Sequence, residues 1–194
     1  MNAPADPDLL YRAERQAEVV AALRAVLPAH ALLWQAEDTT PYECDGLTAY
    51  RQRPLVVALP EDESQVQAVL QACHRLDVPV VARGAGTGLS GGAMPHALGV
   101  TLSLAKFNRI LKLDAASRTA VVQCGVRNLA ISEAAASYGL YYAPDPSSQI
   151  ACTIGGNVAE NSGGVHCLKY GLTLHNVLKV HGFRSEERRV GKEC

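Results

Sequence analysis

A glycine-rich stretch at residues 84–92 has the composition of a site for a phosphate group. Its sequence is GAGTGLSGG, in which five of nine residues are glycine. Successive backbone N–H groups that no side chain obstructs form a concave site for an anion, and the hydroxyls of Thr87 and Ser90 add two donors. A flexible surface loop is the alternative interpretation. Binding is favoured because the stretch directly follows an apolar run that predicts a buried strand.

The stretch matches two phosphate-binding motifs only in part. Gly86 to Gly91 fits G-x-G-x-x-G, but that dinucleotide motif requires a helix to begin at once, and Gly92, Pro95 and Gly99 oppose one. A P-loop requires a lysine after its last glycine, where this sequence has Gly92. An NTPase is therefore disfavoured, and an NAD-linked Rossmann dehydrogenase remains a minor alternative that needs a helix directly after Gly91.

A second segment, residues 144–164, combines prolines that fix the backbone with glycines that permit close approach and with polar side chains. A surface of this kind can hold a flat polar ring. The residues form three runs, Pro144-Asp145-Pro146-Ser147-Ser148, Thr153-Ile154-Gly155-Gly156-Asn157 and Asn161-Ser162-Gly163-Gly164.

With both motifs in view, the sequence resembles the FAD-binding domain of the vanillyl-alcohol oxidase and p-cresol methylhydroxylase (PCMH) superfamily, and within it the FAD-linked subunits of glycolate oxidases. The resemblance rests on VPVVARGAGTGLSGGA and on VRNLAISEAAASYGLYYAPDPSSQIACTIGGNVAENSGGVHCLKYGLTLHN, and it covers about residues 50 to 180. It implies an α+β fold with two small α/β subdomains, truncated here and preceded by an N-terminal helix.

The resemblance also assigns cofactor-binding residues. Some relatives carry a histidine that bonds covalently to the flavin where this sequence has Thr87, so non-covalent FAD is implied. The diphosphate loop corresponds to Gly84, Ala85, Gly86, Thr87, Gly88 and Ser90, and the segment around the flavin to Pro144, Asp145, Ser148, Thr153, Gly155, Gly156, Asn157, Asn161, Gly163 and Gly164.

The implied activity is oxidation of a 2-hydroxy acid, such as glycolate or D-lactate, to the 2-oxo acid, with hydride transfer to flavin N5. Family members bind the substrate with a later cap domain, so no catalytic residue is assigned here and the fragment alone is expected to be inactive. Implied partners are FAD, the 2-hydroxy acid, and iron–sulfur and second flavin-like subunits of a complex. The alternative is a non-catalytic FAD-binding or assembly module that docks to an iron–sulfur subunit.

Other candidate residues have two interpretations each. His166 and His175 lie near the second segment and can be structural or can approach the flavin or substrate. Arg83 can pair with a phosphate or an acidic side chain, or be a surface residue. Six cysteines form no C-x-x-C pair and no zinc-ligand spacing, so buried reduced thiols and no metal site are expected.

The elements that position these residues follow from apolar periodicity. The pattern predicts a helix over residues 8–27. It predicts a second helix after Asp62, which forms a capping box with Gln65, and a third over 128–138, which ends at the C-cap Gly139. It predicts strands over 55–59, 78–82 and 100–104 and a hairpin over 110–114 and 119–123. Residues 29–53, 83–99 and 141–171 are expected to be irregular, with another apolar run over 176–181.

Three parts of the chain are predicted from these elements. They are an N-terminal helix and connector (1–53), an incomplete FAD-binding domain (54–183) and a foreign tail (184–194). RSEERRVGKEC, the tail, is 7/11 charged and resembles the translation of a sequencing adapter; the alternative is a solvated charge run.

Charge and hydropathy restrict the function classes. The net charge of -1 provides no field for nucleic acid, and no apolar run reaches the roughly 20 residues that span a bilayer. The N-terminus has acids where a secretory signal needs basic residues. A soluble cytoplasmic protein is expected, with attachment to the inner membrane through partner subunits as an alternative.

Overall fold

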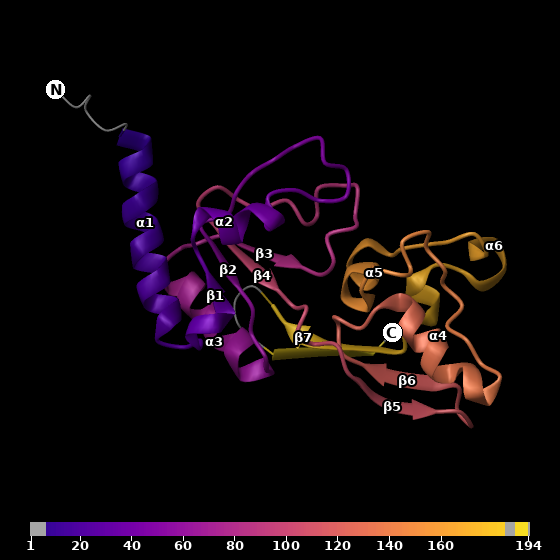
Figure 1. The fold of residues 1–194 in the computed structure, drawn as a ribbon. Coiled ribbons are helices and arrows are strands. Elements are labelled where there is room, and N and C mark those ends of the chain that lie inside the picture. The colour runs from indigo at the N-terminus through magenta and orange to yellow at the C-terminus, as the bar shows by residue number, and fades with distance from the viewer. Residues whose placement is uncertain (1–6, 185–188, 194) are drawn as a thin grey trace.

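The computed structural model describes residues 7–184 and 189–193. Its elements gather into two lobes, each with its own hydrophobic cluster (Figure 1). The first lobe, residues 7–107, holds a sheet with two long helices, and the second, residues 108–178, holds a hairpin with shorter helices. Two small mixed lobes confirm the predicted α+β class.

The first lobe is built on a four-stranded sheet in the order β1-β2-β4-β3. β2 and β3 both run parallel to β4, and β1 is antiparallel to β2. Every residue of β2 and β4 is buried, as expected for short apolar strands in the middle of a parallel sheet. The strands are β1 (Leu32–Leu33), β2 (Val56–Ala58), β3 (Val80–Arg83) and β4 (Val100–Ser103).

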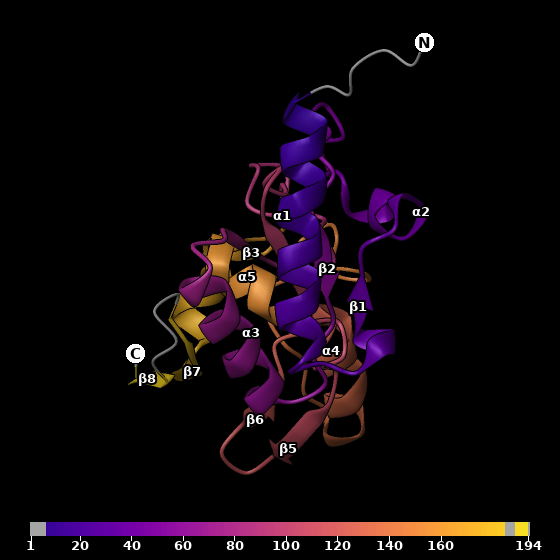
Figure 2. The same cartoon turned by 90° about the vertical axis from the view of Figure 1, so that its left-hand side faces the viewer.

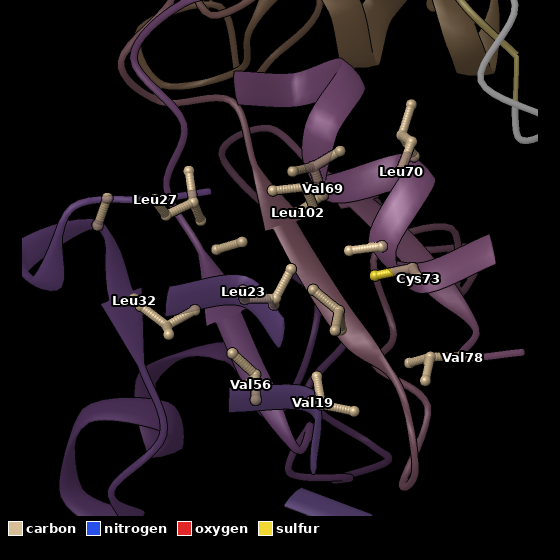
Figure 3. Packing of buried hydrophobic residues seen from close by; sticks show 14 of the residues in the cluster. Val19, Leu23, Leu27, Leu32, Val56, Val69, Leu70, Cys73, Val78 and Leu102 are labelled. Carbon is tan, nitrogen blue, oxygen red and sulfur yellow. The ribbon is translucent and has the colours of Figure 1, made fainter. Parts of the chain in front are cut away.

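Two helices, α1 (Pro7–Arg24) and α3 (Glu63–Arg75), pack against each other and the sheet (Figure 2). Their apolar stripes supply Val19, Leu23 and Val69 to the core around Val56 and Leu102 (Figure 3). Asp62 caps α3 by accepting a hydrogen bond from the Gln65 N–H at 2.8 Å, as predicted. The Gln65 Oε1 atom accepts a hydrogen bond from the Glu61 N–H at 2.9 Å.

The connector 29–53 is more ordered than its sequence predicted. It contains η1 (Ala29–Ala31), β1, α2 (Ala36–Thr39) and η2 (Thr40–Tyr42). Sequence periodicity missed β1 because two residues are too few to show a pattern; the strand exists because it pairs with β2. Ala31 and Leu32 belong to the same buried cluster as the sheet, so the connector contributes to the first lobe's core.

The second lobe opens with the predicted hairpin and helix. β5 (Ile110–Asp114) pairs with β6 (Thr119–Val122), and α4 (Asn128–Ala135) continues as η3 (Ala136–Tyr138) to Gly139, whose φ of 67° gives the left-handed C-cap. Residues 141–171 were expected to be irregular, but they contain α5 (Ile154–Glu160) and α6 (Cys167–Tyr170), followed by η4 (Thr173–Asn176). The core is centred on Val126, Ile131 and Ile154.

The chain then returns toward the first lobe. β7 (Lys179–Phe183) pairs with β8 (Arg189–Glu193), and Phe183 packs against the first hydrophobic cluster. The predicted domain boundary at residue 54 and the foreign origin of residues 184–194 stay predictions. Within the described ranges, no helix has both the length and the apolar character needed to cross a membrane.

Candidate functional site

The first glycine-rich loop emerges from the end of β3 and presents unpaired donors. Within the part of the chain that the structure describes, no N–H group from Ala85 to Ser90 donates to a protein acceptor. Gly86 and Gly91 have φ values of 71° and 83°, in the left-handed region that favours glycine. No helix follows Gly91, so the Rossmann alternative is wrong, and the loop has the donor set of an anion site.

The two glycine-rich segments meet at the start of this loop. A side chain on Gly84 would collide with the hydroxyl of Thr153, the N-cap residue of α5. The other end of α5 also faces the loop, since a Cβ on Gly88 or Gly92 would lie 2.7 or 2.9 Å from Glu160 Oε1. The loop and α5 therefore lie in direct contact, and the structure brings Gly84, Gly88 and Thr153 together.

The start of α5 is fixed by backbone contacts to the turn segment between β6 and α4. Thr153 bridges Arg127, and the N–H groups of Ile154 and Gly155 donate to the carbonyls of Val126 and Cys124 at 2.9 and 2.8 Å. A Cβ on Gly155 would lie 2.8 Å from that of Cys124, so Gly155 serves packing. Gly156 is exposed with only an ordinary contact to Thr153, which leaves its face open to a ligand.

Asn157, on the same helix, is 2% exposed, and its Nδ2 has no hydrogen-bond partner among the described residues. Its Oδ1 accepts a long bond of 3.4 Å from the Ser162 hydroxyl. A buried amide that keeps a free donor is a polar group still to be satisfied. This fits a polar ring seated at α5.

The proline-containing run is held by close backbone contacts. The Pro144 carbonyl accepts from Asn128 Nδ2 at 3.1 Å. Gly164 lies against the backbone of Asp145, where no side chain would fit. Asp145 accepts bonds from the His166 ring at 2.6 Å and from the His166 N–H at 3.2 Å, and these bonds lower the pKa of the Asp145 carboxyl. His166 therefore braces the segment.

The remaining predicted residues of the segment chiefly shape the backbone. Asn161 ends α5 with a φ of 50°, and its side chain accepts from the Leu174 N–H at 2.9 Å. A Cβ on Gly163 would lie 2.6 Å from Leu172, and the Ser148 carbonyl accepts from the N–H groups of Ala151 and Cys152. These contacts, of which only that of Asn161 uses the side chain of a predicted residue, keep the segment compact beside α5.

Two residues behind the first loop have roles that the sequence did not predict. Arg83 is buried and forms no ion pair with a described acidic residue; it donates to the carbonyls of Cys44 and Ala93. Asp45, in the connector, accepts from the Gly91 N–H. Sequence reasoning missed Asp45 because no local pattern links it to a loop 46 residues away. His175, left open above, accepts from the Leu172 N–H and so is bound locally.

The site as a whole suits a ligand with a diphosphate and a flat polar ring. The loop offers N–H groups without a partner among the described residues, and the adjacent helix α5 carries a buried amide with a free donor. Among the described residues, no three His, Cys, Asp or Glu side chains gather as a metal site would require. The arrangement can bind and orient such a cofactor.

Comparison with known proteins agrees with this chemistry. The family model described as "FAD binding domain" matches residues 54–184. The chain is 64% identical over 162 residues to glycolate oxidase subunit GlcD of Escherichia coli K12, covering 84% of this chain and 32% of that protein. It is 39% identical to a D-lactate dehydrogenase of Archaeoglobus fulgidus, covering 70% and 30%. The chain thus spans about a third of the length of these relatives.

Solved structures share the fold. The structure of alkyldihydroxyacetonephosphate synthase superposes with a TM-score of 0.76 at 21% identity, covering 85% of this chain and 33% of the other. At this identity the likeness concerns the fold alone. It extends the α+β description to the PCMH-type arrangement expected from the sequence.

Proposed function

The chain belongs to the FAD-binding domains of the vanillyl-alcohol oxidase and PCMH superfamily, with FAD as the cofactor, and from this premise we propose that it is the FAD-binding portion of a 2-hydroxy-acid oxidoreductase. The observation that carries the proposal is the pairing of a loop with unpaired N–H groups and a helix, α5, that faces it through Gly84 and Thr153.

The loop residues bind the charged part of the cofactor. The N–H groups from Ala85 to Ser90, with the Thr87 and Ser90 hydroxyls, hold the diphosphate. Thr153, Gly156 and Asn157 would contact the flavin, with Pro144, Asp145 and Gly164 holding the segment behind them. Thr87 has no group that bonds to a flavin ring, so the cofactor is held non-covalently.

FAD, when bound, supplies the hydride acceptor. The chain's own residues bind, orient and partly enclose the cofactor. No residue of this chain is assigned to hold the substrate carboxylate or to remove its proton, so we expect this chain alone to have no activity. Relatives named for glycolate and D-lactate support a 2-hydroxy acid as the substrate class.

A non-catalytic FAD-binding or assembly module is the second candidate. It is favoured by the name of the E. coli relative, which is a subunit. On this proposal the chain docks to an iron–sulfur subunit, beside a second flavin-like subunit. A protein of the relatives' full length that contains this chain, assayed without partner subunits, separates the two candidates. Turnover of glycolate or D-lactate with a dye acceptor supports the enzyme, and FAD binding without turnover supports the module.

Cofactor binding is tested by titrating FAD with the purified 194-residue chain and following flavin fluorescence. We expect saturable quenching. Gly86→Ala should weaken binding at least tenfold, because it places a side chain at a positive φ against the Arg83 guanidinium.

Gly139→Ala is the matched control for this variant. Gly139 has nearly the same φ of 67° but lies in the second lobe with no atom near a new Cβ. It should bind FAD like the wild type. Absence of binding by both this chain and the longer protein would contradict the proposed function.

A further inference from the structure

Asp45 is a buried carboxylate that uses both oxygens to hold backbone. It is 5% exposed. Its Oδ1 accepts from the Leu47 N–H at 3.0 Å, within a turn in which Thr48 has a φ of 59°. Its Oδ2 accepts from the Gly91 N–H at 3.0 Å. Hydrogen bonds to a charged acceptor are about twice as strong as neutral ones, so Asp45 is a firm anchor for the far end of the phosphate-binding loop.

The residues beside Asp45 hold the rest of the same loop. The Gly46 N–H donates to the Gly88 carbonyl at 2.9 Å, and a Cβ on Gly46 would lie 2.7 Å from the Thr87 carbonyl oxygen. Arg83 Nη1 donates to the Cys44 carbonyl at 2.8 Å and to the Ala93 carbonyl at 3.2 Å. We call residues 44–46 the clasp, because they contact the loop near its beginning, middle and end.

The clasp stabilises the conformation of a loop whose own N–H groups must remain free for an anion. The N–H groups from Ala85 to Ser90 must stay unpaired to bind an anion, so they cannot fix the loop through internal hydrogen bonds. A loop without such bonds loses conformational entropy when a ligand orders it, and this cost weakens binding. Contacts from outside the loop remove that cost in advance, provided that they use other groups. The clasp contacts the loop through the Gly88 carbonyl and the Gly91 N–H, which are not among the six free N–H groups.

We propose that Asp45 is a positioning residue for the phosphate-binding loop, and that the clasp is a working part of the cofactor site although it precedes the matched family range of 54–184. Asp45 holds Gly91 so that the six preceding N–H groups face one anion. The proposal rests on the proposed function only in taking the FAD diphosphate as that anion.

Asp45→Asn tests the proposal with a nearly isosteric change. The amide oxygen still accepts from Leu47, but the NH₂ group cannot accept from Gly91. We expect the Kd for FAD to rise about tenfold, which corresponds to one lost hydrogen bond of about 1.4 kcal/mol. In hydrogen exchange without FAD, peptides covering residues 85–93 should exchange faster while those of α3 and β2 stay unchanged. Asp38→Asn, an exposed carboxylate on α2, is the matched control and should behave like the wild type.

Two results would overturn the proposal. One is unchanged loop exchange and unchanged FAD affinity in Asp45→Asn. The other is faster exchange throughout the first lobe, which would make Asp45 a general stabiliser of the fold. If the wild-type chain binds no FAD, the proposed function fails, but the exchange experiment still decides whether Asp45 orders the loop.

Discussion

The two glycine-rich segments of this protein use glycine for opposite purposes. In the first loop, glycines keep side chains away from N–H groups that remain unpaired, and the clasp holds the loop from behind. In the second segment, Gly155, Gly163 and Gly164 let the chain pack against itself. The first loop therefore keeps its N–H groups free for a ligand, whereas the second segment uses its glycines for close packing. Similar composition does not imply a similar role.

Gly164→Ala should have the largest effect if the second segment is a self-packed support. The new Cβ would collide with the Asp145 backbone, which cannot rotate away. We expect a loss of about 3 kcal/mol in the stability of the second lobe, measured by hydrogen exchange of residues 141–171. Trp34, the single tryptophan, lies in the first lobe and its fluorescence transition should change little. If Gly164→Ala destabilised the second lobe no more than Gly139→Ala does, close packing at Gly164 would not distinguish the second segment from the first loop.

Gly84→Ala probes the point where the two segments touch. Its Cβ would displace the Thr153 hydroxyl, and we expect a Kd for FAD about tenfold higher than that of the wild type. Thr153→Ala removes the obstructing hydroxyl, so the double variant should bind FAD as Thr153→Ala does. Additive losses in a titration of all four proteins would show that Gly84 acts elsewhere.

Glu160→Gln tests whether the second segment also influences the first loop by charge. The Glu160 carboxylate lies beside Gly88 and Gly92, where it repels a bound diphosphate. Because the residue is exposed, we expect FAD to bind only about threefold more tightly, and less so at high salt. Glu133→Gln removes the same charge from α4 and should leave the fluorescence titration unchanged; equal changes in both variants would contradict a local effect.

The smallest effect concerns the Asp145–His166 bond. Because the folded-state pKa of Asp145 is lowered, the bond contributes stability above the unfolded pKa of about 4 and loses it as pH falls through the folded value. The difference in melting temperature between wild type and Asp145→Asn should therefore shrink as pH falls from 6 toward about 3. A constant difference over this range would show that the carboxylate's charge is irrelevant.

Much of the first lobe was predictable because its apolar patterns are long. The stripe from Val66 to Cys73 buries one face of a helix, and the runs around Val56 and Val100 are strands that are buried throughout. The structure has the helix and both strands where these patterns predict them. Turn chemistry was equally informative, as at Asp62 and Gly139.

The differences arise where tertiary contacts override local preference. α5 contains Gly155 and Gly156, which disfavour a helix, yet it forms because Gly155 packs against Cys124. Asp45 shows the same limit for the site. A carboxylate in an unpatterned connector carries no local sign that it bonds to Gly91. The glycines themselves were recognisable, but their division between binding and packing depends on tertiary contacts that no local pattern reveals.

The sheet order also has a consequence for how the chain folds. β4 inserts between β2 and β3, so the sheet cannot close before residues 100–103 have joined it. Non-local parallel pairing of this kind is slow. The clasp and the loop both precede β4 in the chain, and the second lobe follows it. During synthesis, which proceeds from the N-terminus, the clasp and the phosphate-binding loop therefore leave the ribosome before β4 and before α5.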